Sequence, residues 1–140
     1  MPGVSQSALV QELPAEAITA LLAHAGPGSG SPLACVELRQ VGGALARAIP
    51  GHGAVAGVDA QFVLFVGALA LDADMAALML AHAGRIKAAL APWLGAGHYL
   101  NFAEEVVDTA LSYGATTYAR LRAVKDRIDP DNTIHANHAI

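Results

Sequence analysis

Two stretches in the first half of the chain have the hydrophobic pattern of β-strands. In residues 33–41, LACVELRQV, side chains alternate between two faces, and Glu37 and Arg39 fall on the same face. Residues 61–71, QFVLFVGALAL, form a nearly continuous apolar run, which is typical of a strand buried on both faces. We expect the two strands to pair antiparallel, with Gly67 marking a bulge or a close backbone approach.

Helical patterns precede and follow these strands. The first helix is expected over residues 14–25, with Pro14 in its first turn. Its apolar stripe consists of Ile18, Leu21 and Leu22. A second helix, capped by Asp72 or Asp74, extends to about residue 91. Its apolar face comprises Met75, Met79, Ala83, Ile86 and Leu90.

Two further helices are expected over residues 103–112 and 115–128, with a break at Gly114. The buried side of the last helix is expected to carry Tyr118, Leu121, Val124 and Ile128. This order of elements predicts an α+β fold, an antiparallel sheet flanked by helices with a helical C-terminal segment. It contains only two convincing strands, which make a poor sheet by themselves, so other strands either escape the pattern or lie elsewhere.

The segment between the two strands is expected to be a long loop. Residues 42–57 contain five glycines and Pro50. A loop of this length is often functional. It is not a phosphate-binding loop, because Gly42-Gly43 lacks both the P-loop lysine and the glycine spacing of the dinucleotide motif.

Composition narrows the possible partners. Charged residues make up 14% of the 140 residues, against roughly 25% in typical globular proteins. This low charge fits either an alanine-rich protein, since 31 residues are alanine, or a domain that another surface covers. The net charge of −4 argues against nucleic acid, whose binding needs clustered positive charge.

Cysteine usage and hydropathy predict a cytoplasmic protein without membrane contacts. The single cysteine, Cys35, excludes an internal disulfide and lies in an apolar run, where a packed thiol is expected. The N-terminal residues lack the positive and apolar regions of a signal peptide. The most apolar stretch, residues 62–71, is too short to cross a bilayer.

Several polar residues could carry chemistry, and each has a structural alternative. Asn101 with Glu104 three residues later fits a helix cap, in which case Tyr99 is a packing residue. Glu37 and Arg39 fit an exposed ion pair of little energetic value. The six histidines are scattered or lack a third ligand nearby in sequence, so no metal site is expected.

The run from Tyr99 to Ile140 resembles the C-terminal signature of the berberine-bridge-enzyme-like FAD-linked oxidases. The resemblance rests on several short motifs in one order: Tyr99-x-Asn101, Tyr113-Gly114, Arg120-Leu121, Val124-Lys125, Asp129-Pro130 and Asn132, with Asn137 and Ile140 at the end. A weaker resemblance extends upstream through residues 31–45 and 89–93.

This resemblance implies a division of the chain and a cofactor. Residues 1–98 would be part of a substrate domain, built on a larger antiparallel sheet, and residues 99–140 would complete a flavin domain. The cofactor would be FAD. Its phosphates and adenine are held in the family by an N-terminal domain that does not map onto these residues. The chain is therefore expected to bind FAD weakly alone and to need a flavin-binding domain in cis or in trans.

The resemblance also implies roles for individual residues. Tyr99 would act on a small-molecule substrate as a base or hydrogen-bonding partner, and Asn101 would position the surroundings of the flavin ring. Glu37 and Arg39 would face the substrate cavity. The middle of the second strand, from Phe62 to Phe65, lacks the polar residues of better-known members, so a second catalytic group is absent or comes from elsewhere.

Two functions remain open from the sequence. The first is the C-terminal part of an FAD-dependent oxidoreductase that transfers hydride from a small organic substrate to flavin. The second is a non-catalytic domain derived from such an enzyme, which forms a homo-oligomer or docks on a partner.

Overall fold

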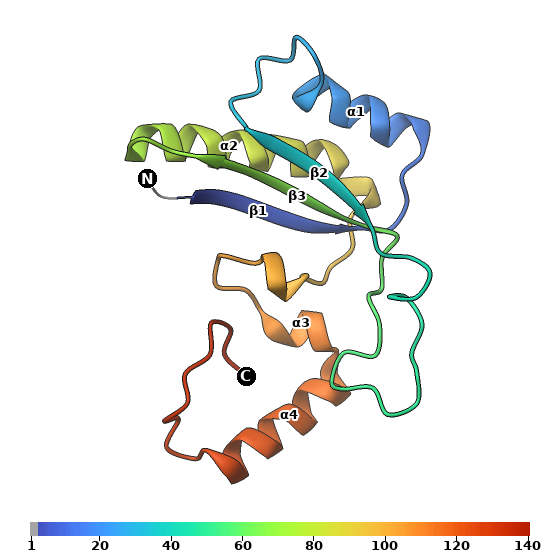
Figure 1. Ribbon diagram of the computed structural model, residues 1–140, viewed down its shortest axis with the longest axis vertical. Helices are drawn as coiled ribbons and strands as arrows, with labels where there is room; N and C mark the ends of the chain where they lie inside the picture. Colours follow the sequence, from blue (N-terminus) through green and yellow to red (C-terminus); the bar gives the residue numbers. More distant parts are fainter. Residues whose placement is uncertain (1–2) are drawn as a thin grey trace.

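The computed structural model describes residues 3–140 and has an α+β fold around a three-stranded antiparallel sheet (Figure 1). The strands are β1 (Gly3–Val10), β2 (Cys35–Gln40) and β3 (Phe62–Leu69). Their order in the sheet is β1-β3-β2, and both pairings are antiparallel. The expected pairing of the two sequence-predicted strands is confirmed, and β3 is the central strand.

Strand β1 is the element that the hydrophobic pattern did not reveal. Its sequence, GVSQSALV, mixes serines and a glutamine with small apolar residues, so neither face has a strong hydrophobic signal. The strand is nevertheless largely buried, because it pairs with β3 along its whole length, from Gly3 opposite Leu69 to Val10 opposite Phe62. The expectation that a strand could escape the hydrophobic pattern is therefore confirmed.

Helices α1 (Ala15–Ala25) and α2 (Ala73–Leu90) cover one face of the sheet. The main core lies between them and the sheet, and its buried residues are Val10, Ala17, Leu21, Leu64, Val66, Ala83, Ile86 and Leu90. Side chains of a strand alternate between faces, so Val66 and Leu64 point into this core while Phe65 points to the opposite face. That opposite face has no helix of this size over it among residues 3–140.

Local sequence signals explain the ends of α2 and the packing of both helices. Asp72 caps α2 by accepting a hydrogen bond from the Met75 amide at 2.7 Å. The chain leaves α2 through a short 3₁₀ turn, η1 (Ala91–Trp93), which contains Pro92. The buried face of α1 is made by Ala17 and Leu21, whereas Ile18 and Leu22 of the expected stripe are exposed.

Of the two C-terminal helices, the first is shorter than predicted, whereas the second has the predicted bounds and the predicted break at Gly114. A 3₁₀ turn, η2 (Leu100–Phe102), is followed by irregular chain, and helix α3 covers only Thr109–Tyr113. Asp108 caps α3 by accepting a hydrogen bond from the Ala110 amide, which explains why the helix begins there and not near residue 103. The longer helix α4 (Ala115–Ile128) begins after Gly114, whose φ of 73° favours glycine.

Helix α4 has no buried residue, contrary to the expected apolar side. Val124 is 50% exposed and Ile128 is 66% exposed. Figure 1 shows that α4 extends away from the sheet, with α3 and the C-terminal tail beside it. An amphipathic pattern therefore exists in the sequence of α4, but the described residues provide no apolar surface against which it packs.

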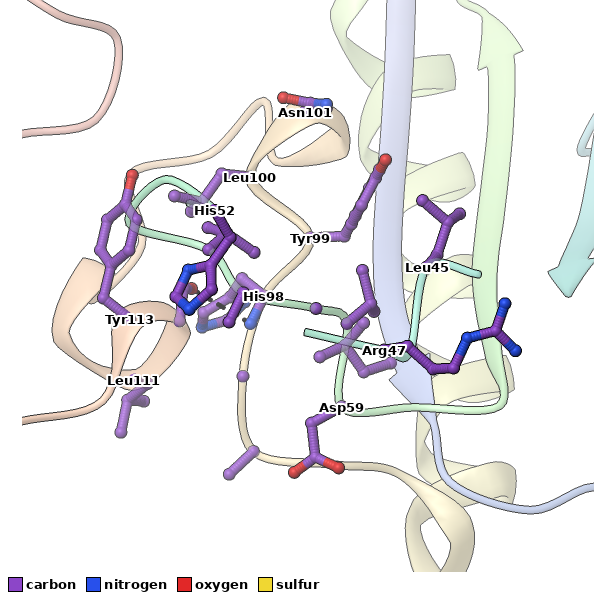
Figure 2. Close-up of a pocket in the computed structure, with 18 of the residues that line it drawn as sticks. Leu45, Arg47, His52, Asp59, His98, Tyr99, Leu100, Asn101, Leu111 and Tyr113 are labelled. Carbon is purple, nitrogen blue, oxygen red and sulfur yellow. Dashed lines mark hydrogen bonds between the residues drawn. The ribbon is translucent and has the colours of Figure 1, made fainter. Parts of the chain in front are cut away.

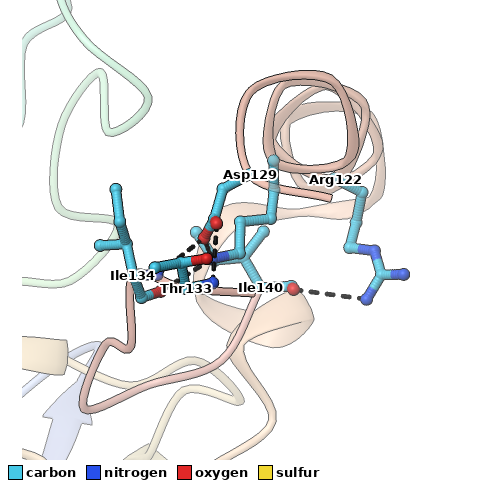
Figure 3. A network of polar contacts seen from close by, with 6 residues as sticks. Arg122, Asp129, Thr133, Ile134 and Ile140 are labelled. Carbon is cyan, nitrogen blue, oxygen red and sulfur yellow. Dashed lines mark hydrogen bonds and ion pairs between the residues drawn. The ribbon is translucent and has the colours of Figure 1, made fainter. Parts of the chain in front are cut away.

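Polar contacts instead hold the tail that follows α4 (Figure 3). Asp129 pairs with Lys125 and accepts hydrogen bonds from the amides of Thr133 and Ile134 at 2.7 and 3.0 Å. Each of the last three residues then contacts a different element: His138 Nε2 donates to Leu100 O at 3.2 Å, Thr109 Oγ1 donates to Ala139 O at 2.6 Å, and Arg122 Nη1 donates to Ile140 O at 3.3 Å. The tail thus turns back and joins η2, α3 and α4.

Candidate functional site

The segment after α2 is held against one end of β1, and this places the Tyr99-x-Asn101 motif on the open face of the sheet. The Gln11 amide donates to Trp93 O at 2.8 Å, and the Gly95 amide donates to Leu9 O at 2.9 Å. The Ser7 hydroxyl then donates to Phe102 O at 3.1 Å. Because Ser7 and Leu9 lie on the face opposite α1 and α2, the turn η2 sits over that face.

Aromatic rings connect this turn to the sheet. The Phe102 ring lies between two others, with its centroid 5.4 Å from that of Phe65 and 5.1 Å from that of Tyr99. The guanidinium of Arg39 lies 4.6 Å from the centre of the Phe102 ring, which is a favourable cation–π position. The structure therefore brings Tyr99, from the C-terminal motif, into one cluster with Arg39, from the predicted strand.

Glu37 and Arg39 form the expected ion pair on this face. Two contacts join them, one of them from Arg39 Nη2 to Glu37 Oε2 at 3.2 Å. The hydrogen bond with Arg39 lowers the pKa of Glu37, and the same bond raises the pKa of Arg39. Both side chains are well exposed, so the pair contributes little to stability. It does keep a guanidinium and a carboxylate together on the open face.

Two expectations about neighbouring residues were wrong. Cys35 is exposed, because it lies on edge strand β2 and on the open face with Glu37 and Arg39. Gly67 is not a bulge, since the register of β3 is regular on both sides. Gly67 instead allows the Phe65 side chain to lie close to the backbone of β3, since a Cβ added at Gly67 would be 3.1 Å from the Phe65 ring.

Asn101 is not a helix cap. It lies inside the 3₁₀ turn η2, and no helix follows directly, so the capping interaction with Glu104 does not form. The Phe102 amide instead donates to Tyr99 O at 2.8 Å, which closes the turn. Asn101 is exposed, and Figure 2 shows it at the edge of the site with its amide pointing away from His98.

A cavity of about 710 Å³ lies beside the turn and is lined by both Tyr99 and Asn101. Its walls are the long loop between β2 and β3, the segment from Ala96 to Asn101, and α3 (Figure 2). Its volume is within the range of about 300–1,000 Å³ that is typical of small-molecule sites. Glu37 and Arg39 do not line it, so the candidate residues fall into an open-face group and a cavity group that share Tyr99.

The cavity also contains residues that sequence reasoning missed. His52, His98, Tyr113 and Ser112 line it together with Tyr99. His52 lies in the glycine-rich loop, whose length was the signal that it could be functional. Tyr113 belongs to the Tyr-Gly motif, but its spacing gave no indication that it faces the same cavity as Tyr99.

The described residues do not fit a complete FAD. Its two phosphates need several positive charges or free helix N-terminal amides, but Arg47 is the one cation other than histidine that lines the cavity. The N-terminus of α3, whose residues form one wall, is already occupied by the Asp108 carboxylate, which would repel a phosphate. The aromatic open face matches only the flat ring portion of such a cofactor.

Two other properties of the described chain bear on function. In residues 3–140, no group of three or more histidine, cysteine, aspartate or glutamate side chains is arranged to hold a metal ion. Over the same range, none of the helices combines the length and apolar character needed to cross a membrane.

Comparison with known proteins agrees with the family resemblance of the C-terminal motifs. Residues 98–140 match the sequence model of the family described as berberine and berberine like. A similar solved structure is wild-type BBE-like 1 from Physcomitrella patens, with a TM-score of 0.73 and 17% sequence identity. The alignment covers 96% of this chain and 29% of the moss protein, so the chain spans less than a third of that relative. A search of curated proteins found no significant match.

The structural likeness includes the sheet, the helices that cover it and the C-terminal segment, since nearly the whole chain is aligned. The family match falls on the part of the chain that carries Tyr99 and Asn101. The same part includes the tail that the Asp129 contacts hold. Residues 98–140 are thus similar to the berberine-like family, and the chain has the fold of the aligned part of the moss protein.

Proposed function

We propose that this chain supplies the substrate side of an FAD-linked oxidoreductase. In that enzyme, hydride passes from a carbon of a small organic substrate to a flavin held by a separate flavin-binding domain, either in cis or in trans. The observation that carries the proposal is the position of Tyr99, which lies on the open sheet face and also lines the 710 Å³ cavity. A group at that junction can contact both a substrate in the cavity and a ring that covers the face.

The open face supports a flavin-binding domain as the partner. It presents the aromatic rings of Phe65 and Phe102 with the Glu37–Arg39 pair beside them, and the helices α1 and α2 cover the other face. Flat rings and a guanidinium are suited to packing against a planar aromatic ligand. The bound flavin would supply the electron acceptor, while this chain binds and orients the substrate.

Tyr99 is proposed to accept a hydrogen bond or a proton from the substrate as hydride leaves. Proton acceptance requires stabilisation of the phenolate by positive charge or hydrogen bonds. Arg39 is the cation in its cluster, since both side chains contact the Phe102 ring. Asn101 is proposed to contact the flavin surroundings from the edge of the cavity, which agrees with its exposed position.

The test is a comparison of two tyrosine variants with a flavin-binding domain supplied in trans. Tyr99→Phe removes one hydroxyl and keeps the packing of the ring, so turnover should fall by at least about tenfold while thermal stability stays unchanged, because a positioned acid or base contributes roughly 10²-fold or more. Tyr118→Phe, on exposed helix α4, is the matched control and should keep full turnover. Equal turnover in both variants would reject Tyr99 as a catalytic group.

A second candidate function is a non-catalytic docking or oligomerising domain, and the exposed apolar side of α4 favours it. Large exposed apolar patches often mark interaction surfaces. Under this alternative, the chain would form dimers or larger species by light scattering, and Val124→Asp in α4 would return it to a monomer. A flavin-binding domain would then produce no turnover with either tyrosine variant or with the unchanged chain.

A further inference from the structure

The last three residues of the tail each take part in one hydrogen bond, with η2, α3 and α4 respectively. The first of these contacts uses a side chain of the tail, the ring of His138. Its partner is Leu100 O, in the turn that directly follows Tyr99. On α3, the contact is made by the hydroxyl of Thr109, which is 3% exposed. The end of the tail therefore closes against the segment that carries the Tyr99-x-Asn101 motif, and a titratable ring makes one of the contacts.

The surroundings of the His138 ring determine which of its nitrogens carries the hydrogen. Nε2 lies 3.2 Å from Leu100 O. A carbonyl oxygen can only accept a hydrogen bond, so Nε2 carries the hydrogen of the neutral ring and Nδ1 carries none. The Nδ1 atom is buried and has no hydrogen-bond partner within residues 3–140. The closed tail therefore accommodates the neutral ring, because an unprotonated Nδ1 needs no acceptor.

The protonated ring fits the same position poorly. Protonation adds a hydrogen and a positive charge at Nδ1, the buried atom without an acceptor. A buried N–H that finds no acceptor loses its hydration and gains no hydrogen bond in return. In an open tail the same N–H contacts water, so protonation favours the open tail. Histidine changes its charge between about pH 5 and 8. The contact of His138 with Leu100 therefore stabilises the closed tail in the upper part of this range, and this stabilisation is lost as the pH falls.

Neighbouring charges do not compensate for a charge on this ring. Within residues 3–140, no carboxylate forms an ion pair with a histidine. The carboxylate of Asp108 already accepts a hydrogen bond at the start of α3, and Glu104 and Glu105 are exposed, so water screens them. The titratable or charged residues on η2, on α3 and on the chain around them, together with those of α4 and the tail that lie nearest in contact or sequence, are His98, Tyr99, Glu104, Glu105, Asp108, Tyr113, Arg122 and His135.

We infer that His138 is a pH-dependent switch for the end of the tail, which is closed against η2 while the ring is neutral and is released when the ring is protonated. Residues 138–140 then leave η2 and α3, while Asp129 still holds the amides of residues 133 and 134. The switch makes the contact between the tail and the turn beside Tyr99 depend on pH. It does not rest on the proposed function, since all the groups involved belong to this chain.

The test is NMR of the complete chain alone, in which the His138 ring and the amides of residues 138–140 are followed from pH 8 to pH 5. We expect the amides to change in one transition, with the same midpoint as the titration of the ring. The ratio of closed to open tail should fall by about 5-fold to 150-fold, the range for one buried N–H left without an acceptor. Asp129 cannot cause this transition, because the hydrogen bond from Lys125 lowers its pKa below 3.8 and its carboxylate stays ionised throughout.

Three variants assign the transition to His138. His138→Gln keeps a side-chain N–H that can donate to Leu100 O but does not titrate, so the end of the tail should stay closed from pH 8 to pH 5. His138→Ala removes the donor, and the end of the tail should be open over the whole range. The pH response should disappear in both. His135→Gln, at an exposed histidine of the same tail, is the matched control and should keep the response of the unchanged chain.

Three outcomes would overturn the inference. The first is an unchanged chain in which the His138 ring becomes protonated while the amides of residues 138–140 keep their closed-tail signals. The second is a chain that shows no transition of these amides between pH 8 and pH 5. The third is a pH response that survives in His138→Gln or His138→Ala, or that is lost in His135→Gln, because another titrating group would then control the tail.

Discussion

The sheet with α1 and α2 and the segment from α3 to the tail are built in different ways. In the first region, Leu64, Ile86 and Leu90 are almost completely buried, and apolar packing joins the helices to the strands. In the second, α4 buries no residue, and the chain is held by the Asp129 contacts and by hydrogen bonds that the last three residues make with η2, α3 and α4. One region has a core of its own, and the other depends on polar contacts.

The difference indicates how each region obtains its stability. Most of the stability of a helix in a protein comes from packing of an amphipathic face, so α2 is stabilised by its neighbours in this chain. Helix α4 has the same kind of pattern without such neighbours. This exposed apolar side is the observation that favours the alternative function, a docking or oligomerising domain.

The largest expected effect comes from truncating one leucine or valine in each region. Leu64→Ala removes a fully buried side chain and should lower the free energy of unfolding by about 2–5 kcal/mol. Val124→Ala, at a half-exposed position of α4, should change it by no more than about 0.5 kcal/mol. Denaturant unfolding followed by circular dichroism measures both values. Similar losses in the two variants would mean that α4 is part of the same cooperative core.

Removing the cap of one helix in each region tests the same difference in stability with a smaller expected effect. Asp72→Ala should cost about 1 kcal/mol of global stability, because α2 belongs to the core. Asp108→Ala removes an equivalent cap from the short helix α3. It should increase hydrogen exchange of the α3 amides and leave the global unfolding midpoint nearly unchanged. A large global loss from Asp108→Ala would contradict the independence of the two regions.

The smallest expected effect is a pH-dependent opening of the tail. The hydrogen bond from Lys125 lowers the pKa of Asp129 below its ordinary value of 3.8, and the amides of Ile134 and Thr133 act in the same direction. A lowered pKa means that the ionised carboxylate stabilises the folded tail above pH 3.8 and that this stabilisation is lost as the pH falls below it. NMR of the Thr133 and Ile134 amides should show this change.

Asp129→Asn is the control for the tail, since its side chain carries no charge at any pH. The tail amides of this variant should be less protected from exchange near neutral pH, and their protection relative to the intrinsic exchange rate should show no further change in acid. If the tail of the unchanged chain stays closed well below pH 3.8, the hydrogen bonds of the last three residues, and not Asp129, hold it in place.

The sequence predicted the fold best where one pattern determines one structure. The cap at Asp72, the apolar face of α2 and the antiparallel pairing of β2 with β3 all follow from local composition and alternation. Strand β1 was missed because its serines and glutamine hide the alternation, and only pairing with β3 makes it a strand. The buried side of α4 was predicted wrongly, because the periodicity of apolar residues indicates that a helix has an apolar face but does not indicate whether another part of the chain covers that face.

The candidate site could be predicted only in part for a similar reason. Tyr99 and Asn101 were singled out through a motif, and both line a cavity, while their roles stay a proposal. The position of His52 in the wall of the cavity depends on the turn formed by Pro50 and Gly51 and on a loop that folds back over residues distant in sequence. The clustering of Arg39 with Tyr99 depends on the packing of Phe102 between the sheet and η2, which no spacing in the sequence encodes.

The central position of β3 has a consequence for how the chain acquires its structure during synthesis. Strands β1 and β2 both pair with β3 and not with each other, yet β3 is made last of the three. Until the long loop and β3 have been translated, neither β1 nor β2 therefore has a strand with which to pair. Pairing between segments so distant in sequence slows folding, because the intervening chain must first lose conformational freedom. A nascent chain that ends before Phe62 contains two of the strands and cannot form the sheet.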